Sequence, residues 1–223
     1  MSRTLVTFLL DRTGSMEPIR DDTILAFNAY LETLQEDGED IFFSLLTFDS
    51  MSIDKVHVNR PVKEVERLTR ESFVPRASTP LIDAAYKTIK AVEKSVGGGD
   101  TKVVICIQTD GQENASTEHG WDQLNALIKE KSEAGWQFNF MGAGIDAYQQ
   151  GRRMGIADAQ TMSYNMVDPE ATKAAFAASA EVSKSFAKGM ARDTSYSAAQ
   201  KKQAGDRFDP AEAKPKIVDD ITL

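Results

Sequence analysis

The sequence has little cysteine, little histidine and no long apolar run. Its 223 residues include one cysteine, Cys106, and two histidines. An intramolecular disulfide is therefore impossible, which is typical of proteins from a reducing compartment, so we expect a cytoplasmic protein. No apolar stretch approaches the roughly 20 residues that span a bilayer. Residues 5–10, "LVTFLL", are also shorter than the apolar core of a signal peptide, and we expect no membrane association.

Basic residues are in the minority. The chain has 26 Lys and Arg against 34 Asp and Glu, which gives a formal net charge of −8. Proteins that bind nucleic acid neutralise phosphates with clustered Lys and Arg, and no such cluster is present. We therefore expect no nucleic-acid partner. Hydrophobic residues make up 41% of the chain, which is enough for a buried core.

Short apolar runs alternate with segments of helical periodicity. The runs have the length and the β-branched or aromatic composition of strands, and they cover residues 4–10, 41–48, 102–108 and 136–141. Apolar residues repeat at helical spacing within residues 24–34, 81–96, 121–128 and 171–186. Residues 54–62 alternate in polarity and contain Pro61, which is typical of an edge strand or hairpin. This order predicts an α/β fold with a doubly wound, mostly parallel central sheet and helices on both faces.

The periodic pattern ends near residue 189. We expect one domain over residues 1–189, followed by a flexible or peripherally docked C-terminal tail over residues 190–223, which is polar and carries charges of both signs. The last seven residues, "IVDDITL", are apolar enough to dock on the domain as a strand.

Three polar clusters fall where predicted strands and loops end. Asp11, Thr13 and Ser15 follow the first strand, Thr79 opens a predicted helix, and Asp110 follows the strand of residues 102–108. Ligands of open α/β sheets bind at the carboxyl ends of the strands, so we expect these side chains to converge. Two carboxylates and three hydroxyls suit a hard cation, Mg²⁺, Mn²⁺ or Ca²⁺, better than zinc or copper. Two carboxylates leave such an ion under-neutralised, and it should attract an external anion.

Each of these residues also has an ordinary structural role available. Thr79 and Ser15 are suitable helix caps, and Asp11 can hydrogen-bond to the turn that ends its strand. Helix caps do not require acids and hydroxyls together at three neighbouring loops, so the joint occurrence favours the metal site. Asp49 and Asp146 also lie near strand ends, and we expect them to cap and solvate loops.

The motifs "DRTGS", "TPL" and "TDG" resemble the three loops of the metal-ion-dependent adhesion site of von Willebrand factor A-type domains. The resemblance covers roughly residues 3–165. Thr13 stands where the family usually has a serine, so a hydroxyl is retained and a methyl group is added. The resemblance implies that Thr13 and Ser15 are direct ligands and that Thr79 binds the metal directly or through water. It also implies that Asp11 and Asp110 hold the metal largely through water.

The same resemblance implies a sheet with a short antiparallel edge strand. It also implies a protein partner whose Asp or Glu completes the metal shell, and hence a metal-dependent protein-binding module of the adhesion or scaffold type. Two alternatives stay open, a metal-free structural interaction module and a Mg²⁺-dependent hydrolase of the phosphatase kind. We expect no enzyme, because Thr13 occupies the position where aspartyl phosphatases have a second acid. In addition, no histidine accompanies the cluster, and Cys106 lies within a strand.

Overall fold

Six strands and six α-helices make up the regular structure of the part of the chain that the computed structural model describes, residues 3–97 and 100–207. The strands are β1 (Thr4–Asp11), β2 (Ile41–Phe48), β3 (Ile53–Pro61), β4 (Lys102–Thr109), β5 (Gln137–Ala143) and β6 (Thr161–Tyr164). The helices are α1 (Arg20–Gln35), α2 (Leu81–Val96), α3 (Trp121–Glu133), α4 (Ala147–Met154), α5 (Pro169–Ala187) and α6 (Ala198–Gln203).

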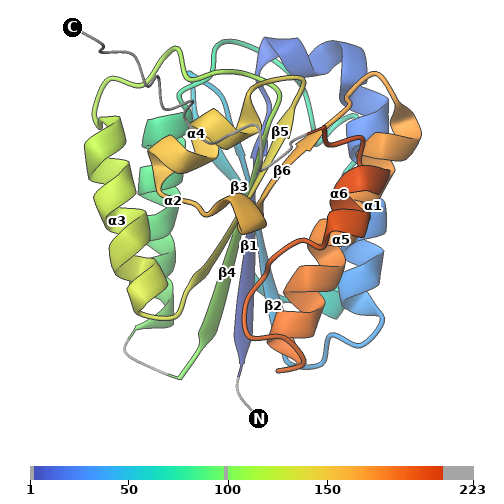
Figure 1. Cartoon of the computed structure of the whole chain (residues 1–223), viewed down its shortest axis with the longest axis vertical. Helices are drawn as coiled ribbons and strands as arrows, with labels where there is room; N and C mark the ends of the chain where they lie inside the picture. Colours follow the sequence, from blue (N-terminus) through green and yellow to red (C-terminus); the bar gives the residue numbers. More distant parts are fainter. Residues whose placement is uncertain (1–2, 98–99, 208–223) are drawn as a thin grey trace, which may run out of the picture.

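The strands form one sheet in the order β3-β2-β1-β4-β5-β6. All neighbours pair in parallel except β3, which runs antiparallel to β2 at the sheet edge. The predicted fold class is therefore confirmed, including the edge strand that contains Pro61. β1 lies between β2 and β4, so the chain leaves β1 toward one side of the sheet and later returns on the other. The carboxyl ends of these three strands meet at the upper edge in Figure 1, the position where open α/β sheets bind ligands.

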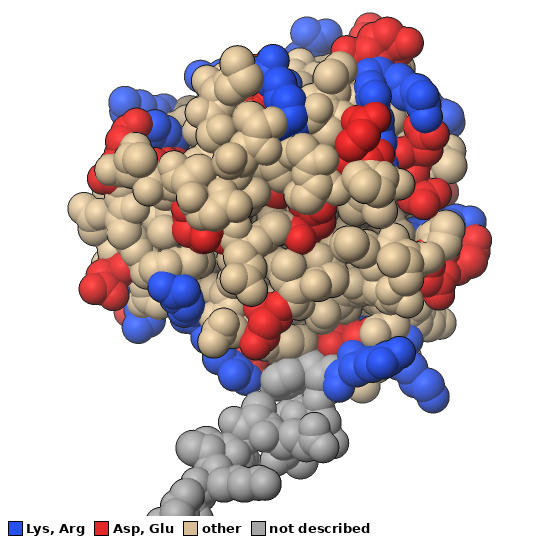
Figure 2. Space-filling model, turned by 90° about the horizontal axis from the view of Figure 1, so that it is seen from above, with Lys and Arg blue, Asp and Glu red and all other residues tan. Residues whose placement is uncertain are grey.

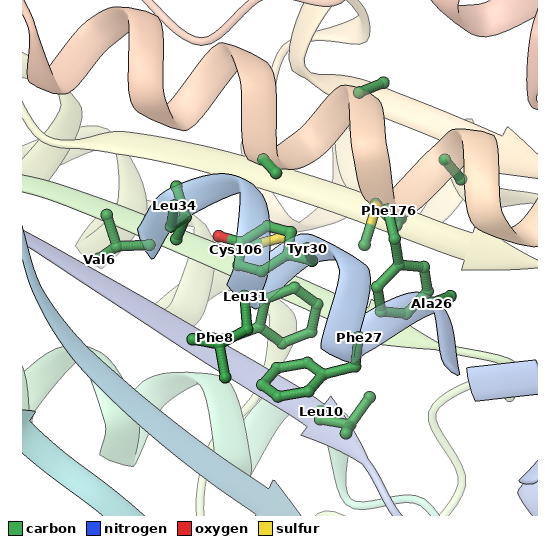
Figure 3. Packing of buried hydrophobic residues seen from close by; sticks show 14 of the residues in the cluster. Val6, Phe8, Leu10, Ala26, Phe27, Tyr30, Leu31, Leu34, Cys106 and Phe176 are labelled. Atoms are coloured by element: carbon green, nitrogen blue, oxygen red, sulfur yellow. The ribbon is translucent and has the colours of Figure 1, made fainter. Parts of the chain in front are cut away.

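Helices cover both faces of the sheet (Figure 1). α1 and α5 pack on one face, and α2, α3 and α4 pack on the other, so that each face has its own apolar cluster. Phe8 of β1 is at the centre of the first cluster, with its ring centroid 5.4 Å from that of Phe27, 4.9 Å from that of Tyr30 and 5.7 Å from that of Phe176 (Figure 3). Burial on both faces explains why the central strands are almost continuously apolar in sequence.

Three elements were not predicted from the sequence: β6, α4 and α6. β6 has only four residues, and α4 and α6 are short and polar. α6 belongs to the segment that we expected to be a tail, and residues around it contact the domain. The Asn139 side chain donates to the Thr194 carbonyl at 2.8 Å, and Tyr196 and Ala204 are buried.

The division of the chain at residue 189 stays a prediction. The segment "IVDDITL" lies outside the described residues. Among the residues that are described, no helix combines the length and the hydrophobicity needed to cross a bilayer.

Candidate metal centre

All five predicted site residues lie at the carboxyl edge of the sheet. Asp11 is the last residue of β1, Thr13 and Ser15 lie at the start of the short 3-10 helix η1 (Gly14–Ile19), Thr79 precedes α2, and Asp110 follows β4. Figure 2 looks down on this edge, where acidic side chains show between uncharged ones and basic side chains lie mainly toward the outline.

A chain of polar contacts connects the three loops. The Thr79 hydroxyl donates to Thr13 Oγ1 at 3.3 Å, and Thr13 Oγ1 lies 3.2 Å from Ser15 Oγ. Ser15 Oγ in turn donates to Asp110 Oδ1 at 2.7 Å. Asp11 joins the chain because its Oδ1 accepts the Thr13 backbone N–H at 2.7 Å. The structure therefore brings together all five side chains that the sequence singled out.

The carboxylates of Asp11 and Asp110 are buried, and burial makes their ionised forms unfavourable. Asp11 is 0% exposed and Asp110 is 8% exposed. Burial raises the pKa of Asp11 to about 6, although hydrogen bonds from Thr109 and Thr13 partly oppose the shift. Burial also raises the pKa of Asp110, against the hydrogen bond from Ser15. Neither carboxylate forms an ion pair with a basic side chain of residues 3–97 or 100–207.

The donor set fits a hard divalent cation. Its five side chains offer only oxygen, and the absence of imidazole and thiolate disfavours zinc and copper. No group of three or more His, Cys, Asp or Glu residues in the described structure could hold a metal by itself. A cation at this cluster would therefore need the three hydroxyls in addition to the two carboxylates.

Neither Thr79 nor Ser15 acts as a helix cap. The residue that precedes α2 is Pro80, which makes no side-chain capping bond. The first amides of α2 are instead satisfied from another loop, because Ile82 N–H donates to a Glu113 carboxylate oxygen at 2.8 Å. The Thr79 and Ser15 hydroxyls are thus free of the ordinary capping role and face the cluster.

The outcome for the other two strand-end acids is mixed. Asp146 caps α4 by accepting the Gln149 N–H at 2.9 Å, as expected. Asp49 does not solvate a loop: it is 2% exposed, and its carboxylate accepts from Arg12 and Arg76. Asp49 does cap its loop as expected, because its Oδ1 accepts the backbone N–H groups of Met51 at 2.6 Å and Ser52 at 3.0 Å. The expectation that it is solvated was wrong, because two arginines distant in sequence pack against the buried carboxylate.

Three supporting residues were missed by the sequence analysis. The Thr109 hydroxyl donates to Asp11 Oδ2, and Asn114 Oδ1 accepts the Thr79 backbone N–H at 2.9 Å. Gly111 leaves space for Thr79, because a Cβ at position 111 would lie 2.9 Å from Thr79 Oγ1. Thr109 and Gly111 flank Asp110 in sequence, so the motif itself pointed to them, whereas no pattern marked Asn114.

No known family model matches the sequence, and no curated protein does. Solved structures match by their fold. A von Willebrand factor type A protein from Catenulispora acidiphila matches with a TM-score of 0.59 at 16% identity, over 82% of this chain and 43% of that one. The fold is the von Willebrand factor A type.

Two further structures share this fold. The open form of the pilus adhesin SpaC from Lactobacillus rhamnosus GG matches with a TM-score of 0.64 at 13% identity, over 83% of this chain and 30% of that one. Manganese-loaded TRAP protein from Plasmodium vivax matches with a TM-score of 0.51 at 14% identity, over 79% of this chain and 74% of that one. The chain thus spans less than half the length of the Catenulispora and SpaC chains.

Proposed function

We propose that this chain is a protein-binding module that uses a divalent cation, Mg²⁺, Mn²⁺ or Ca²⁺, to bind a carboxylate of its partner. The observation that carries the proposal is the pairing of two buried, unneutralised carboxylates, Asp11 and Asp110, with three hydroxyls that serve no capping role. Buried charges are normally paired or coordinated to a metal. A cation would remove the cost of ionising both acids at once.

The residues of the cluster have distinct roles in this proposal. Thr13 and Ser15 would bind the cation through their hydroxyls, and Thr79 would bind it directly or through water. Asp11 and Asp110 would hold it largely through water. The bound cation would supply the positive charge that no basic side chain of the described residues gives to Asp11 or Asp110 through an ion pair. The hydrogen bonds from Thr13 and Ser15 to the two acids orient the carboxylates in advance.

An acidic side chain from a protein is the partner chemistry that fits best. Two carboxylates balance a dication only if both are fully ionised and close, so an additional anionic oxygen is favoured at an open position. The chain carries a net charge of −8, which disfavours the approach of an acidic partner on average, whereas a bound cation would attract it locally. The fold likeness to a pilus adhesin and to a manganese-loaded protein agrees with both parts of the proposal.

We propose binding rather than catalysis. The Cys106 thiol is buried, and burial raises its pKa to about 12, which makes it a poor nucleophile. His119 stacks on Tyr86 with ring centroids 3.8 Å apart, and its Nδ1 contacts Asp83 Oδ1 at 2.9 Å. The Asp83 carboxylate also accepts the His119 backbone N–H at 2.9 Å, which is the pattern of a loop anchor rather than of a general base.

The test has two stages, and the first concerns the ion alone. Mg²⁺ or Mn²⁺ at millimolar concentration should raise the melting temperature relative to EDTA, because a ligand that binds only the folded state stabilises it. Asp110→Ala should abolish this shift. An unchanged melting temperature for the unsubstituted chain would refute the cation site and favour a metal-free interaction module.

The second stage concerns the partner. Immobilised protein should capture its partner from an extract in Mg²⁺ and release it in EDTA. Thr79→Ala should lose the capture while keeping its fold by circular dichroism. Thr33→Ala is the matched control, since Thr33 lies in α1, far from the cluster in sequence, and its hydroxyl donates to the Ala29 carbonyl at 3.0 Å within the same helix. Capture that survives both EDTA and Thr79→Ala would show that the partner binds elsewhere.

A further inference from the structure

A buried ion-pair network lies beside the candidate metal centre, with Asp49 in its middle. Asp49 follows β2 directly and its side chain is fully buried. The two arginines that contact it belong to the loops of the centre. Arg12 lies between Asp11 and Thr13 in sequence, and Arg76 lies three residues before Thr79.

Both oxygens of the Asp49 carboxylate accept hydrogen bonds from neighbouring residues. Its Oδ2 accepts from Arg12 Nε at 3.0 Å, from Arg12 Nη2 at 2.8 Å and from Arg76 Nε at 2.9 Å. Its Oδ1 accepts the backbone N–H groups of Met51 at 2.6 Å and Ser52 at 3.0 Å. One oxygen therefore joins the two arginines, and the other fixes the turn between β2 and β3.

Backbone hydrogen bonds run alongside this ionic link. Arg76 N–H donates to the Arg12 carbonyl at 2.9 Å, and Gly14 N–H donates to the Ala77 carbonyl at 3.0 Å. The loop of Thr13 and the loop that precedes Thr79 are thus joined twice through the backbone and once through Asp49.

We propose that Asp49 is a positioning residue that fixes the spacing between the Thr13 and Ser15 hydroxyls and the Thr79 hydroxyl, and thereby sets the cation affinity of the centre. The part that concerns affinity rests on the proposed function. Asp49 does not contact the cluster itself, so it acts through Arg12 and Arg76. In other metal sites, residues that orient the ligands without binding the metal themselves change metal affinity by roughly 10- to 100-fold.

Asp49→Asn tests the proposal because it removes the charge and nearly keeps the shape. Arg76→Gln is a second, milder variant: Arg76 is partly exposed, and the change removes the ion pair between Asp49 and the Thr79 loop while leaving the backbone hydrogen bonds and the pairing of Arg12 with Asp49 in place. Asp54→Asn is the matched control. Asp54 also pairs with Arg12, at 2.7 Å, but its side chain is 47% exposed and forms no ion pair with Arg76 among the described residues.

Two measurements on the full chain separate positioning from general stability. The first is the Mn²⁺ dissociation constant by electron paramagnetic resonance, at a temperature where circular dichroism shows each variant folded. We expect it to rise roughly 10-fold in Asp49→Asn and Arg76→Gln and to change little in Asp54→Asn. The second is hydrogen exchange of the amides of residues 14 and 76 in metal-free protein, which should quicken in the same two variants only.

The possible results separate the positioning role of Asp49 from its effect on cation affinity. If both variants exchange and bind Mn²⁺ like Asp54→Asn, the positioning role of Asp49 is overturned. If Asp49→Asn fails to fold, Arg76→Gln decides alone. If the unsubstituted chain binds no Mn²⁺, the proposed function and the affinity role fail together, and the exchange measurement still supports or overturns the coupling between the two loops.

Discussion

Replacing Asp11 with asparagine should stabilise the metal-free protein at neutral pH. The Asp11 carboxylate is fully buried and makes no ion pair within the described residues, so its negative charge is a cost in the absence of a cation. Asparagine has nearly the same shape, carries no charge and can still accept the Thr13 N–H that Asp11 accepts at 2.7 Å. A substitution that stabilises the chain and removes cation binding would mark Asp11 as a residue kept for function.

The pKa of Asp11 sets the size and the pH range of this effect. Burial raises this pKa from its ordinary 3.8 to about 6 in the metal-free fold. That difference corresponds to roughly 3 kcal/mol at most, since each pH unit is worth about 1.4 kcal/mol. Because the pKa is raised in the folded state, the cost is absent below about pH 4, grows as the pH rises to about pH 6 and is constant above it. For a chain of this length, a difference of roughly 3 kcal/mol in the free energy of unfolding corresponds to roughly 6–12 °C in melting temperature.

Urea unfolding followed by circular dichroism measures the effect. In EDTA at pH 7.5, Asp11→Asn should have the higher free energy of unfolding, and at pH 4 the two proteins should be equal within error. Saturating Mg²⁺ should stabilise the unsubstituted chain by about 2.7 kcal/mol at 100 times its dissociation constant and leave Asp11→Asn unchanged. If Asp11→Asn is the less stable protein in EDTA at pH 7.5, the carboxylate stabilises the fold and our account of its burial is wrong.

Three other substitutions or probes test separate parts of the structure. Gly111→Ala should keep the fold but reduce the stabilisation by Mg²⁺, because the new Cβ would lie 2.9 Å from Thr79 Oγ1; an unchanged Mg²⁺ response would mean that Thr79 is not a ligand. Cys106 should resist thiol reagents at pH 8 in the native protein and react in urea, because it is buried and its pKa is about 12; rapid native labelling would contradict its burial. Phe8→Ala should lower the free energy of unfolding by roughly 3–5 kcal/mol, measured by urea titration, because the fully buried ring contacts three other aromatic rings; a loss below 1 kcal/mol would show that the core refills the space.

Most of the fold was predictable because burial on both faces leaves a strong pattern. The four central strands are apolar along their length and were predicted from these continuous runs, whereas α2 carries an apolar residue every three or four positions and was predicted from periodicity. The elements that were missed lack this signal. β6 has four residues at the sheet edge, and α6 is recognisable only from the Ser197 capping box, in which Ser197 Oγ accepts the Gln200 N–H at 3.2 Å.

The sequence also predicted which residues gather at the candidate metal centre, since parallel strands end at one edge of their sheet. It did not predict what holds them there. Asn114 and Glu113 hydrogen-bond to Thr79 and to Ile82 at the start of α2, each more than thirty positions earlier in the sequence. Such contacts depend on the conformation of the loops, and they leave no periodic pattern in a single sequence.

The charge balance near Asp11 illustrates the same difficulty. In sequence, Asp11 is followed at once by Arg12, and the pair looks neutral. In the structure Arg12 N–H donates to the Phe48 carbonyl at 2.9 Å, so the backbone is still extended there and successive side chains point to opposite sides. The Arg12 guanidinium therefore pairs with Asp49 and Asp54, while Asp11 faces the hydroxyl cluster. The nearest positive charge in sequence is thus already neutralised on the far side of the loop, and no other basic side chain of residues 3–97 or 100–207 forms an ion pair with Asp11.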